Sequence, residues 1–355
     1  MSNDTTIGVD LAKSVFEVAV SQEVGRVSSR RRLSRSKFLP YFQQQAPATV
    51  VMEACGSAHH WARTLEKMAH TVVLLPPSQV RPYVVRNKTD QCDARALLEA
   101  YRNESIMPVP VKSIDTQVLA SLHRFREGWM HRRTALLNSI RGSLRELGVF
   151  IPEGARLVLP KLAELLEEPS SPLPVILRPA LRRAIEEVKA LEGSVRELEA
   201  QLEAVSAQNP QVQRLRTVPG IGLLTATALV AFVGDLGRFP SGRRLAAYLG
   251  LTPREHSSGN RRRLGGISKR GNTYVRTFLI HGARSSLRYA REKKGPQGRL
   301  QVWARSVADR RGYNIAAVAL ANKMARLAWA VCREEKTFSE LNCAVETTEA
   351  TETTA

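Results

Sequence analysis

Four acidic residues in the amino-terminal third of the chain have the types and positions that metal binding requires. Asp10 ends the apolar run TIGVD, and Glu53 ends the similar run VVME. Burying a carboxylate at a strand end is costly unless it binds something, and two such strand ends in one sheet can converge. Asp90 and Asp93 lie three residues apart at the start of a predicted helix, so both project from one face.

Carboxylates that meet at one edge of a sheet repel one another unless cations lie between them. Hard oxygen ligands select Mg²⁺ or Mn²⁺. Two such ions can polarise a phosphodiester and stabilise its attacking and leaving oxygens. Each acid taken alone could be a turn or helix-capping residue. The four together favour a metal site, with two ions, that acts on phosphodiesters.

A rival protein class has a similar sheet whose first strand also ends in Asp, namely the sugar kinases and actin-like ATPases. In those proteins a glycine-containing turn follows the Asp, because bare backbone must approach the phosphates. Here the sequence after the strand is DLAKS. The missing glycine argues against an ATPase.

The carboxy-terminal third is strongly basic. The whole chain has a formal net charge of +20 and a pI of about 10.4, and residues 211–330 contain 23 Lys and Arg against 4 Asp and Glu. A field of this strength suits a polyanion, since each neutralised phosphate releases condensed counterions. Nucleic acid is therefore the expected partner. Tyr274 could offer a stacking face for a base, and the cations that could position phosphates are Arg254, Arg261, Arg262, Arg263, Lys269, Arg270 and Arg276.

Two short glycine-containing motifs lie in this basic region. TVPGIG, with Gly220 and Gly222, precedes an Ala-rich helix and is typical of a helix-hairpin-helix, whose free N–H groups can hold a DNA phosphate. An ordinary tight helical hairpin would have the same pattern. In EHSSGN, Ser258 stands directly before Gly259, which allows a tight turn. Ser258 or its neighbour Ser257 could be a nucleophile, a turn former or a phosphate contact.

The elements that must position these residues fall into four regions. Residues 1–110 show a strand, helix, strand pattern and predict an α/β domain with a mostly parallel sheet. Residues 111–209 are helical, with a heptad seam that runs from Leu181 to Val205. Residues 210–333 predict a mostly helical domain with glycine-rich loops, and residues 334–355 predict a disordered tail.

The heptad seam leaves two interpretations open. An earlier helix, roughly residues 116–147, carries apolar residues at similar spacing: Leu122, Phe125, Trp129, Leu136 and Ile140. The two helices could form an antiparallel arm within one chain, or the seam could meet a second chain in a dimerising coiled coil. A seam does not reveal whose helix it meets.

Other features indicate where the protein acts. No apolar run approaches the roughly 18 residues that span a bilayer, and the amino terminus has no secretory signal pattern. The four cysteines lie far apart with no CxxC pair. A disulfide framework or zinc site is not expected, and a reducing cytoplasm fits.

The motifs VMEACGS, NKTDQCDAR, VPGIG, LGLTPREHSSG and GGISKRGN occur in an order and spacing that resemble the DEDD transposases of bacterial insertion sequences. The resemblance extends from IGVDLAKS to about residue 333. It implies an RNase H-like (RuvC-like) amino-terminal domain in which Asp10, Glu53, Asp90 and Asp93 bind Mg²⁺ or Mn²⁺. It also implies that Ser258, in a serine-bearing carboxy-terminal domain, joins DNA covalently.

The same resemblance implies partners that composition and spacing do not reveal. Members of the family act on double-stranded DNA, at the element ends and at the target, and are directed by a structured guide RNA. They form homodimers that assemble into tetramers, with the active site shared between protomers. Their expected place is the bacterial cytoplasm, at the nucleoid, with no membrane.

Two further functions fit the residues. In a RuvC-type nuclease, water would attack the phosphodiester and Ser258 would only contact a phosphate. A non-catalytic helix-hairpin-helix protein would bind DNA equally well with and without Mg²⁺. A covalent protein–DNA adduct is expected for the serine-using transposase, but not for the nuclease or the non-catalytic protein.

Overall fold

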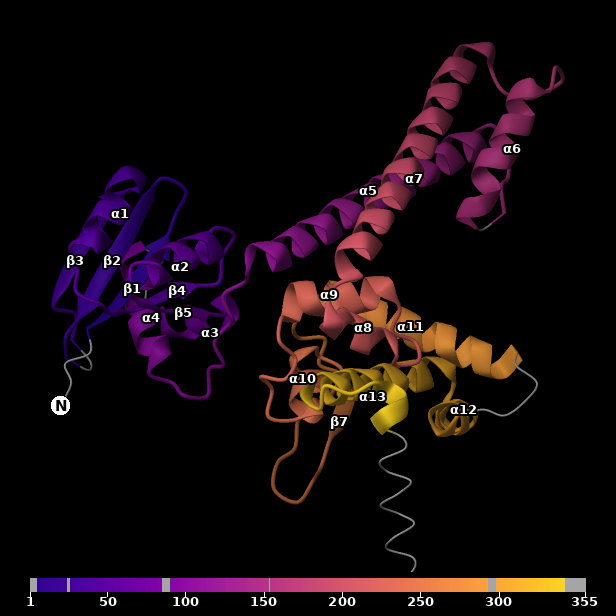
Figure 1. Cartoon of the computed structure of the whole chain (residues 1–355). Coiled ribbons are helices and arrows are strands. Elements are labelled where there is room, and N and C mark those ends of the chain that lie inside the picture. The colour runs from indigo at the N-terminus through magenta and orange to yellow at the C-terminus, as the bar shows by residue number, and fades with distance from the viewer. Residues whose placement is uncertain (1–4, 24–25, 85–89, 153, 293–297, 342–355) are drawn as a thin grey trace, which may run out of the picture. The chain divides into compact units, whose positions relative to one another are not determined.

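The computed structural model describes residues 5–23, 26–84, 90–152, 154–292 and 298–341. The chain divides into two compact units, Met1–Ser113 and Ile114–Ala355, and each is described by itself. Figure 1 shows the first unit in indigo to purple and the second in magenta to yellow.

The first unit contains a five-stranded mixed sheet with the order β3-β2-β1-β4-β5. Strand β1 pairs antiparallel with β2 and parallel with β4, while β2–β3 is antiparallel and β4–β5 parallel. The strands are β1 (Thr6–Leu11), β2 (Val15–Ser21), β3 (Ser29–Ser34), β4 (Thr49–Glu53) and β5 (Thr71–Leu75). The prediction of a mostly parallel sheet is wrong, because β3 has the sequence SRRRLS and lacks the apolar alternation of a strand.

Helices cover both faces of this sheet. On one face, α1 (Arg35–Gln43) and α2 (Ala58–Glu66) pack their aromatic residues edge to face against β2, with Phe38 4.6 Å from Phe16 between ring centroids. On the other face lies α4 (Asp90–Tyr101), whose Leu97 packs with Val51 of β4. The short helices α3 (Pro77–Val80) and η1 (Arg81–Tyr83) follow β5. The acid-bearing strands are therefore covered by α4.

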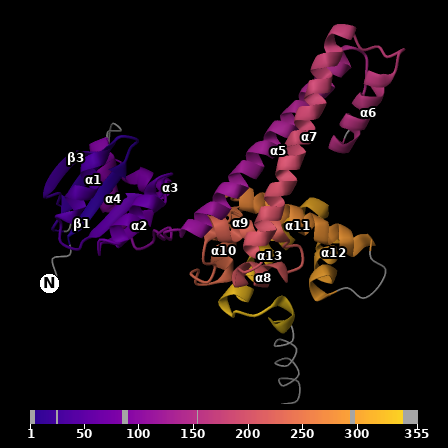
Figure 2. The ribbon, with the colours of Figure 1, turned by 45° about the horizontal axis from the view of Figure 1, so that its top comes forward.

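The second unit begins with a helical arm, which Figures 1 and 2 show as a long hairpin. It consists of α5 (Ile114–Glu146), α6 (Ala155–Glu167), η2 (Val175–Leu177) and α7 (Arg178–Ser206). The seam of α7 packs within this chain. Val188 shares a core with α5 and α6, and Leu198 and Leu202 share one with α5 and α9.

Two ion pairs also join α5 to α7. Arg126 Nε donates to Glu199 Oε1 at 2.7 Å, and Arg133 Nε donates to Glu192 Oε1 at 2.7 Å. The seam that could have met a second chain is thus occupied by α5 of the same chain. Phe125, expected in the apolar stripe of α5, is instead 60% exposed.

The described remainder of the second unit is helical apart from one β-hairpin. Helix α9 lies at the centre and is buried along almost its whole length. The elements are α8 (Pro210–Arg216), α9 (Leu223–Val233), α10 (Gly242–Tyr248), β6 (Pro253–Glu255), β7 (Leu264–Ile267), α11 (Thr273–Glu292), α12 (Arg299–Arg311) and α13 (Tyr313–Arg333). The β6–β7 hairpin falls in the segment for which glycine-rich loops were expected.

Helix α13 and the segment after it differ from the sequence expectations. By length and composition α13 could cross a membrane, although no such run was expected. Its Leu320, Met324 and Ala328 are fully buried among the other helices, so α13 is a core helix of this unit. Beyond it, Phe338 and Leu341 also contact the core. The prediction of a disordered tail is therefore wrong for residues 334–341, and the rest of that tail, residues 342–355, lies outside the described residues.

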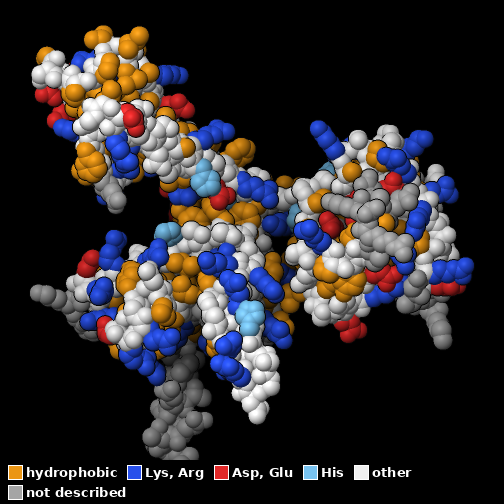
Figure 3. Space-filling view, turned by 180° about the vertical axis from the view of Figure 1, so that it is seen from behind, with side chains coloured by type: hydrophobic (Ala, Val, Ile, Leu, Met, Phe, Trp, Pro, Cys, Tyr) orange, Lys and Arg blue, Asp and Glu red, His pale blue; other side chains and the backbone are white. Residues whose placement is uncertain are grey.

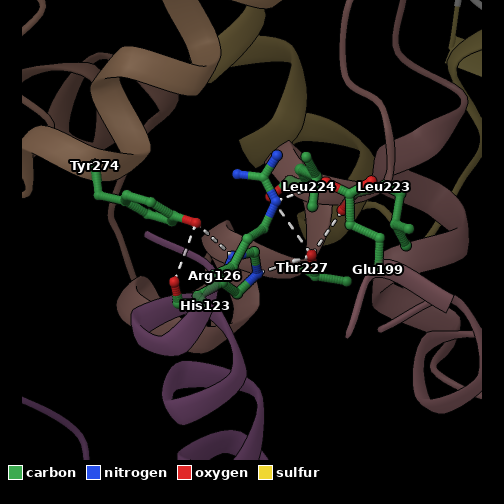
Figure 4. A network of polar contacts seen from close by, with 7 residues as sticks. All are labelled: His123, Arg126, Glu199, Leu223, Leu224, Thr227 and Tyr274. Carbon is green, nitrogen blue, oxygen red and sulfur yellow. Dashed lines mark hydrogen bonds and ion pairs between the residues drawn. The ribbon is translucent and has the colours of Figure 1, made fainter. Parts of the chain in front are cut away.

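A polar network at the base of the arm connects α5 to the central helices (Figure 4). His123 of α5 is completely buried. Its Nε2 lies 2.9 Å from Thr227 Oγ1 on α9, and its Nδ1 lies 3.0 Å from Tyr274 Oη on α11. Because the Thr227 hydroxyl donates to the Leu223 carbonyl at 2.7 Å, His123 Nε2–H donates to Thr227 and Nδ1 accepts from Tyr274. The network thus holds one neutral tautomer of His123.

We predict that this network makes the second unit sensitive to acid. Burial, and next the charge of Arg126, lower the pKa of His123 from 6.5 to about 4. Between these values the unfolded chain binds a proton that the folded chain does not, so stability falls as pH drops from 6.5 toward 4, by up to about 1.4 kcal/mol per pH unit. His123→Phe should be less stable at pH 7 but should lose less stability than the wild type over this window.

Differential scanning calorimetry at several pH values measures this loss. The control is His131→Gln, since His131 is an exposed residue of the same helix; this variant should keep the wild-type dependence. Equal acid sensitivity in His123→Phe and the wild type would contradict the role of the network.

Candidate active site

Two of the predicted acids are neighbours on adjacent parallel strands. Val9 of β1 pairs with Met52 of β4, and one residue further along come Asp10 and Glu53. Because side chains alternate along a strand, both acids lie on the face opposite to Val9 and Met52. Adjacent strands lie roughly 4.8 Å apart, so the two carboxyl groups share one edge of the sheet. Both residues are half-buried and take part in polar interactions.

A close approach of α4 to β1 places Ala94, the residue after the third acid, against this face. A Cβ added to Gly8 would lie 2.5 Å from the Ala94 carbonyl oxygen and 3.1 Å from Leu98 Cγ. Gly8 precedes Asp10 by two residues and therefore shares its face, while Ala94 directly follows Asp93. The half-buried Asp93 is thus carried by the first turn of α4, next to the acid-bearing face. Asp90 starts the same helix, but its side chain lies outside the described residues.

A fifth carboxylate, which the sequence analysis did not single out, lies beside Asp10. Glu17 of β2 is the direct cross-strand partner of Asp10 and is only 7% exposed. On its other side Glu17 pairs with Arg32 of β3, with 3.4 Å between Oε1 and Nε. The row across the sheet is therefore Arg32, Glu17, Asp10 and Glu53. The signal available in the sequence was an isolated acid in the apolar strand VFEVAVS.

These carboxylates supply the hard oxygen donors that Mg²⁺ and Mn²⁺ prefer. Among the residues that the structure describes, no three Asp, Glu, His or Cys side chains come close enough together to hold a metal ion. Asp10 and Glu53 lie side by side on adjacent strands, and the Asp90 side chain lies outside the described residues. The donor chemistry fits a divalent ion, and the complete ligand set remains a prediction.

The predicted serine lies at the tip of the β6–β7 hairpin in the second unit. The hairpin closes through a tight turn in which the Ser258 and Arg261 backbones exchange N–H to carbonyl hydrogen bonds of 3.3 and 3.1 Å. Gly259 at the first central position has φ +54°, as the commonest turns of this length require. Figure 3 shows the hairpin projecting from the lower edge of its unit. The tip is fully accessible to a large ligand.

The two adjacent serines have different surroundings. The Ser257 hydroxyl donates to Glu255 Oε1 at 2.8 Å and accepts from the Arg263 N–H at 3.2 Å. No hydrogen bond of the Ser258 hydroxyl is found within the described residues, and its side chain is exposed. Ser257 therefore supports the hairpin, and Ser258 presents an available hydroxyl.

The candidate cations separate into exposed and structural ones. Arg262 lies 3.4 Å from Glu255, as Nε to Oε1, in an exposed pair. Arg276, by contrast, is 6% exposed, and its Nη1 donates to the carbonyl oxygens of Leu249 and Arg270 at 3.1 and 3.0 Å. Arg276 thus supports the base of the hairpin segment and contributes no free surface. The exposed candidates are Arg254, Arg261, Arg262, Arg263, Lys269 and Arg270.

The stacking role expected of Tyr274 does not fit its surroundings. Its ring packs edge-on against Phe278, with centroids 4.7 Å apart, and its hydroxyl contacts His123. Burial raises the pKa of this hydroxyl to about 12. Tyr274 is therefore part of the network at the base of the arm.

The predicted helix-hairpin-helix turn lies between α8 and α9. A Cβ on Gly220 would lie 2.9 Å from Met324 Cε and 3.0 Å from the Gly282 carbonyl oxygen, so Gly220 serves close packing. Gly222, the N-cap of α9, has open space where a Cβ would stand. An open groove of about 650 Å³ runs past this turn, lined also by Arg216, by His281 and by Glu199, which is paired with Arg126. The first N–H groups of a helix lack partners within it, so the groove suits an anionic ligand.

Comparison with known proteins identifies the family. Residues 212–296 match the family described as "Transposase IS116/IS110/IS902 family", and residues 7–149 match the DEDD_Tnp_IS110 family, described as "Transposase". The chain belongs to the IS110 family of transposases. This agrees with the resemblance found in the motifs.

Relatives of this transposase are similar over nearly their full lengths. It is 44% identical over 338 residues to the "Probable family 20 transposase" of Pseudomonas aeruginosa, covering 95% of this chain and 99% of the relative. It is 38% identical to the "Transposase for insertion sequence element IS1111A" of Coxiella burnetii, covering 95% and 92%. For the "Transposase for insertion sequence element IS1328" of Yersinia enterocolitica the identity is 36%, covering 96% and 100%.

The tight packing at Gly8 leads to a prediction. Gly8→Ala should force α4 away from β1, because no real Cβ is found 2.5 Å from a carbonyl oxygen. Overpacking of this kind destabilises by about 1–3 kcal/mol. DNA cleavage should fall further than the stability loss explains, since Asp93 moves with α4.

Thermal unfolding and a DNA cleavage assay below the unfolding temperature check this prediction. Gly56→Ala is the control for stability, because nothing lies within 4 Å of its added Cβ. A Gly8→Ala protein with wild-type stability and cleavage would show that α4 does not need this approach.

Proposed function

We propose that this transposase cuts and rejoins DNA through a covalent bond to Ser258, with divalent metal ions held by the acids of the first unit. The observation that carries the proposal is the placement of Asp10 and Glu53 one residue beyond the paired Val9 and Met52, on the face of the sheet that α4 covers. The strand order β3-β2-β1-β4-β5 supports an RNase H-like fold for this unit. The family assignment supports DNA as the substrate.

The residues that would hold the ions are Asp10, Glu53, Asp90 and Asp93. Two Mg²⁺ or Mn²⁺ ions bound there would supply charge neutralisation of the phosphate and of the attacking and leaving oxygens. The protein's own part is to fix the carboxylates: β1 and β4 hold two of them in register, and α4 carries the other two. Glu17 is neutralised by Arg32, so it adds little repulsion to the row.

Ser258 would act as the nucleophile. Its Oγ forms a bond to phosphorus, the hydroxyl proton leaves, and the bond from phosphorus to the deoxyribose oxygen breaks, with that oxygen taking up a proton. The phosphoserine link keeps the energy of the broken bond, so a second strand can be joined without ATP. The cations beside the tip, chiefly Arg261 and Arg263, would offset the phosphate charge. Gly222 and the groove beside it would bind the DNA backbone at a second place, away from the phosphate that reacts.

The resemblance suggests further partners for this reaction. We propose a guide RNA that directs the protein to its DNA, and a homodimer that assembles into a tetramer, acting in the cytoplasm. The excess of cations in residues 211–330 supports binding of more than one polyanion. A nuclease that uses water is the second candidate, favoured if the Ser258 hydroxyl only contacts a phosphate.

Two serine variants test the nucleophile. Ser258→Ala should bind DNA normally but form no covalent complex, because its hydroxyl is the one left available. Ser257→Ala should retain part of the adduct, since this change removes only hairpin support. Denaturing gels with labelled DNA compare the two. A Ser258→Ala protein that still traps DNA covalently would assign the nucleophile to another residue.

Metal dependence gives a separate test. Asp10→Ala should abolish cleavage and adduct formation while the fold stays intact, because removing one carboxylate also relieves repulsion in the row. Circular dichroism and the same gels measure the two effects. Cleavage by the wild type in excess chelator would contradict a metal-dependent mechanism, and loss of helicity in Asp10→Ala would indicate a structural role for this acid.

A further inference from the structure

A second basic surface lies on the first unit, far in sequence from the serine-bearing region. Residues 26–37 contain six Lys and Arg, and no Asp or Glu occurs from residue 24 to residue 52. Strand β3 lies at the edge of the sheet, and five of its six residues are exposed. We name the side chains of Arg30, Arg31, Arg32 and Arg35 the basic edge. Figure 3 shows Lys and Arg side chains along the outer rim of this unit.

Protection of an edge strand does not account for so many cations. Charged side chains on an edge strand prevent pairing with other chains, and β3 together with the start of α1 carries four arginines. Adjacent like charges repel one another. Arg32 pairs with Glu17, whereas Arg30 and Arg31 have no ion-pair partner in the described part of the chain. Uncompensated charge of this kind suits an anionic ligand.

The basic edge adjoins the acid row. Arg32 stands opposite Glu17, which stands opposite Asp10, so the three side chains share one face. Arg30, two residues from Arg32, faces the same way, whereas Arg31 faces the side that α1 and α2 cover. The outer end of the row of carboxylates is thus bordered by guanidinium groups.

Arg35 extends this border to the turn that follows β1. Its Nη1 donates to the Lys13 carbonyl oxygen at 3.4 Å, and its guanidinium lies 5.1 Å from the centroid of the Trp61 ring. Lys13 belongs to the turn between β1 and β2, three residues after Asp10. Because Trp61 belongs to α2, Arg35 lies on the face opposite to the acids, and it carries positive charge around the outer end of the row.

We propose that the basic edge binds the phosphate backbone of the DNA strand that is cut at the acid row. The inference rests on the proposed function and extends it with a binding surface. A row of carboxylates repels a phosphodiester, so cations beside it are needed to hold the strand while the reaction proceeds. DNA is the occupant because the strand that reaches Asp10 is the one a transposase cuts. One guanidinium group can donate two hydrogen bonds to a phosphate at the same time. The use of arginines rather than lysines therefore favours a phosphate as the ligand.

The test uses the full-length protein and a DNA duplex, with chelator present so that no cleavage occurs. In one variant Arg30, Arg31 and Arg35 are all changed to Gln, which leaves the Arg32–Glu17 pair in place. The plot of log affinity against log salt should become less steep, by about 0.9 for each phosphate that is no longer neutralised, or by about 2.7 for three phosphates. The control changes Arg182, Arg183 and Lys189 to Gln, three exposed cations of α7, and should keep the wild-type slope.

The outcomes separate this inference from its alternatives. An unchanged slope in the first variant would overturn it, and so would weaker binding to a structured RNA with normal binding to DNA. If the triple variant does not fold, Arg30→Gln alone should still lower the slope by about 0.9. Reaction with phenylglyoxal gives a second measurement, in which DNA should protect Arg30 and Arg31. Because binding is measured without catalysis, a failure of the serine mechanism would leave this result intact.

Discussion

The close approach of α4 to β1 is the constraint on which the candidate active site depends. Only a residue without a Cβ allows the Ala94 carbonyl oxygen to lie against Gly8. This contact holds the first turn of α4, which includes Asp93, against the face from which Asp10 and Glu53 project. A larger residue in β1 would leave the strand register unchanged but would separate the acids of the strands from those of the helix.

Charge balance is the second feature of that face. Glu17 is buried beside Asp10, and a buried carboxylate without a partner would be strongly unfavourable. Arg32 compensates it from the edge strand, and its neighbours extend positive charge outward. The face thus combines carboxylates suited to metal ions with cations suited to phosphates. Both are needed if a polyanion is to approach a row of acids.

The second unit combines a rigid base with an exposed tip. His123, Thr227 and Tyr274 join the arm to the central helices through a buried network, and Arg276 fixes the segment from which the hairpin extends. Apart from the half-buried Ile267, the strand residues of the hairpin are exposed, and two strands alone are marginally stable in water. Ser258 therefore stands on an element that a bound partner would help to order.

The sequence predicted the elements with strong periodicity and missed those without it. The strands that carry Asp10 and Glu53, and the helices of the arm, follow from apolar patterns. Strand β3 could not be predicted, because its arginines have no apolar alternation and its place is set by pairing with β2. The roles of Tyr274 and Arg276 also depend on tertiary packing. Their types suggested contacts with nucleic acid, but distant helices surround them.

Anomalous diffraction from crystals grown with Mn²⁺ tests the central claim most directly, because it locates the ions without any assay of activity. The account predicts peaks in contact with the carboxylates of Asp10 and Glu53, with Asp93 or Asp90 as a further ligand. Peaks that lie elsewhere on the chain, or no peak at this sheet edge at saturating Mn²⁺, would contradict it.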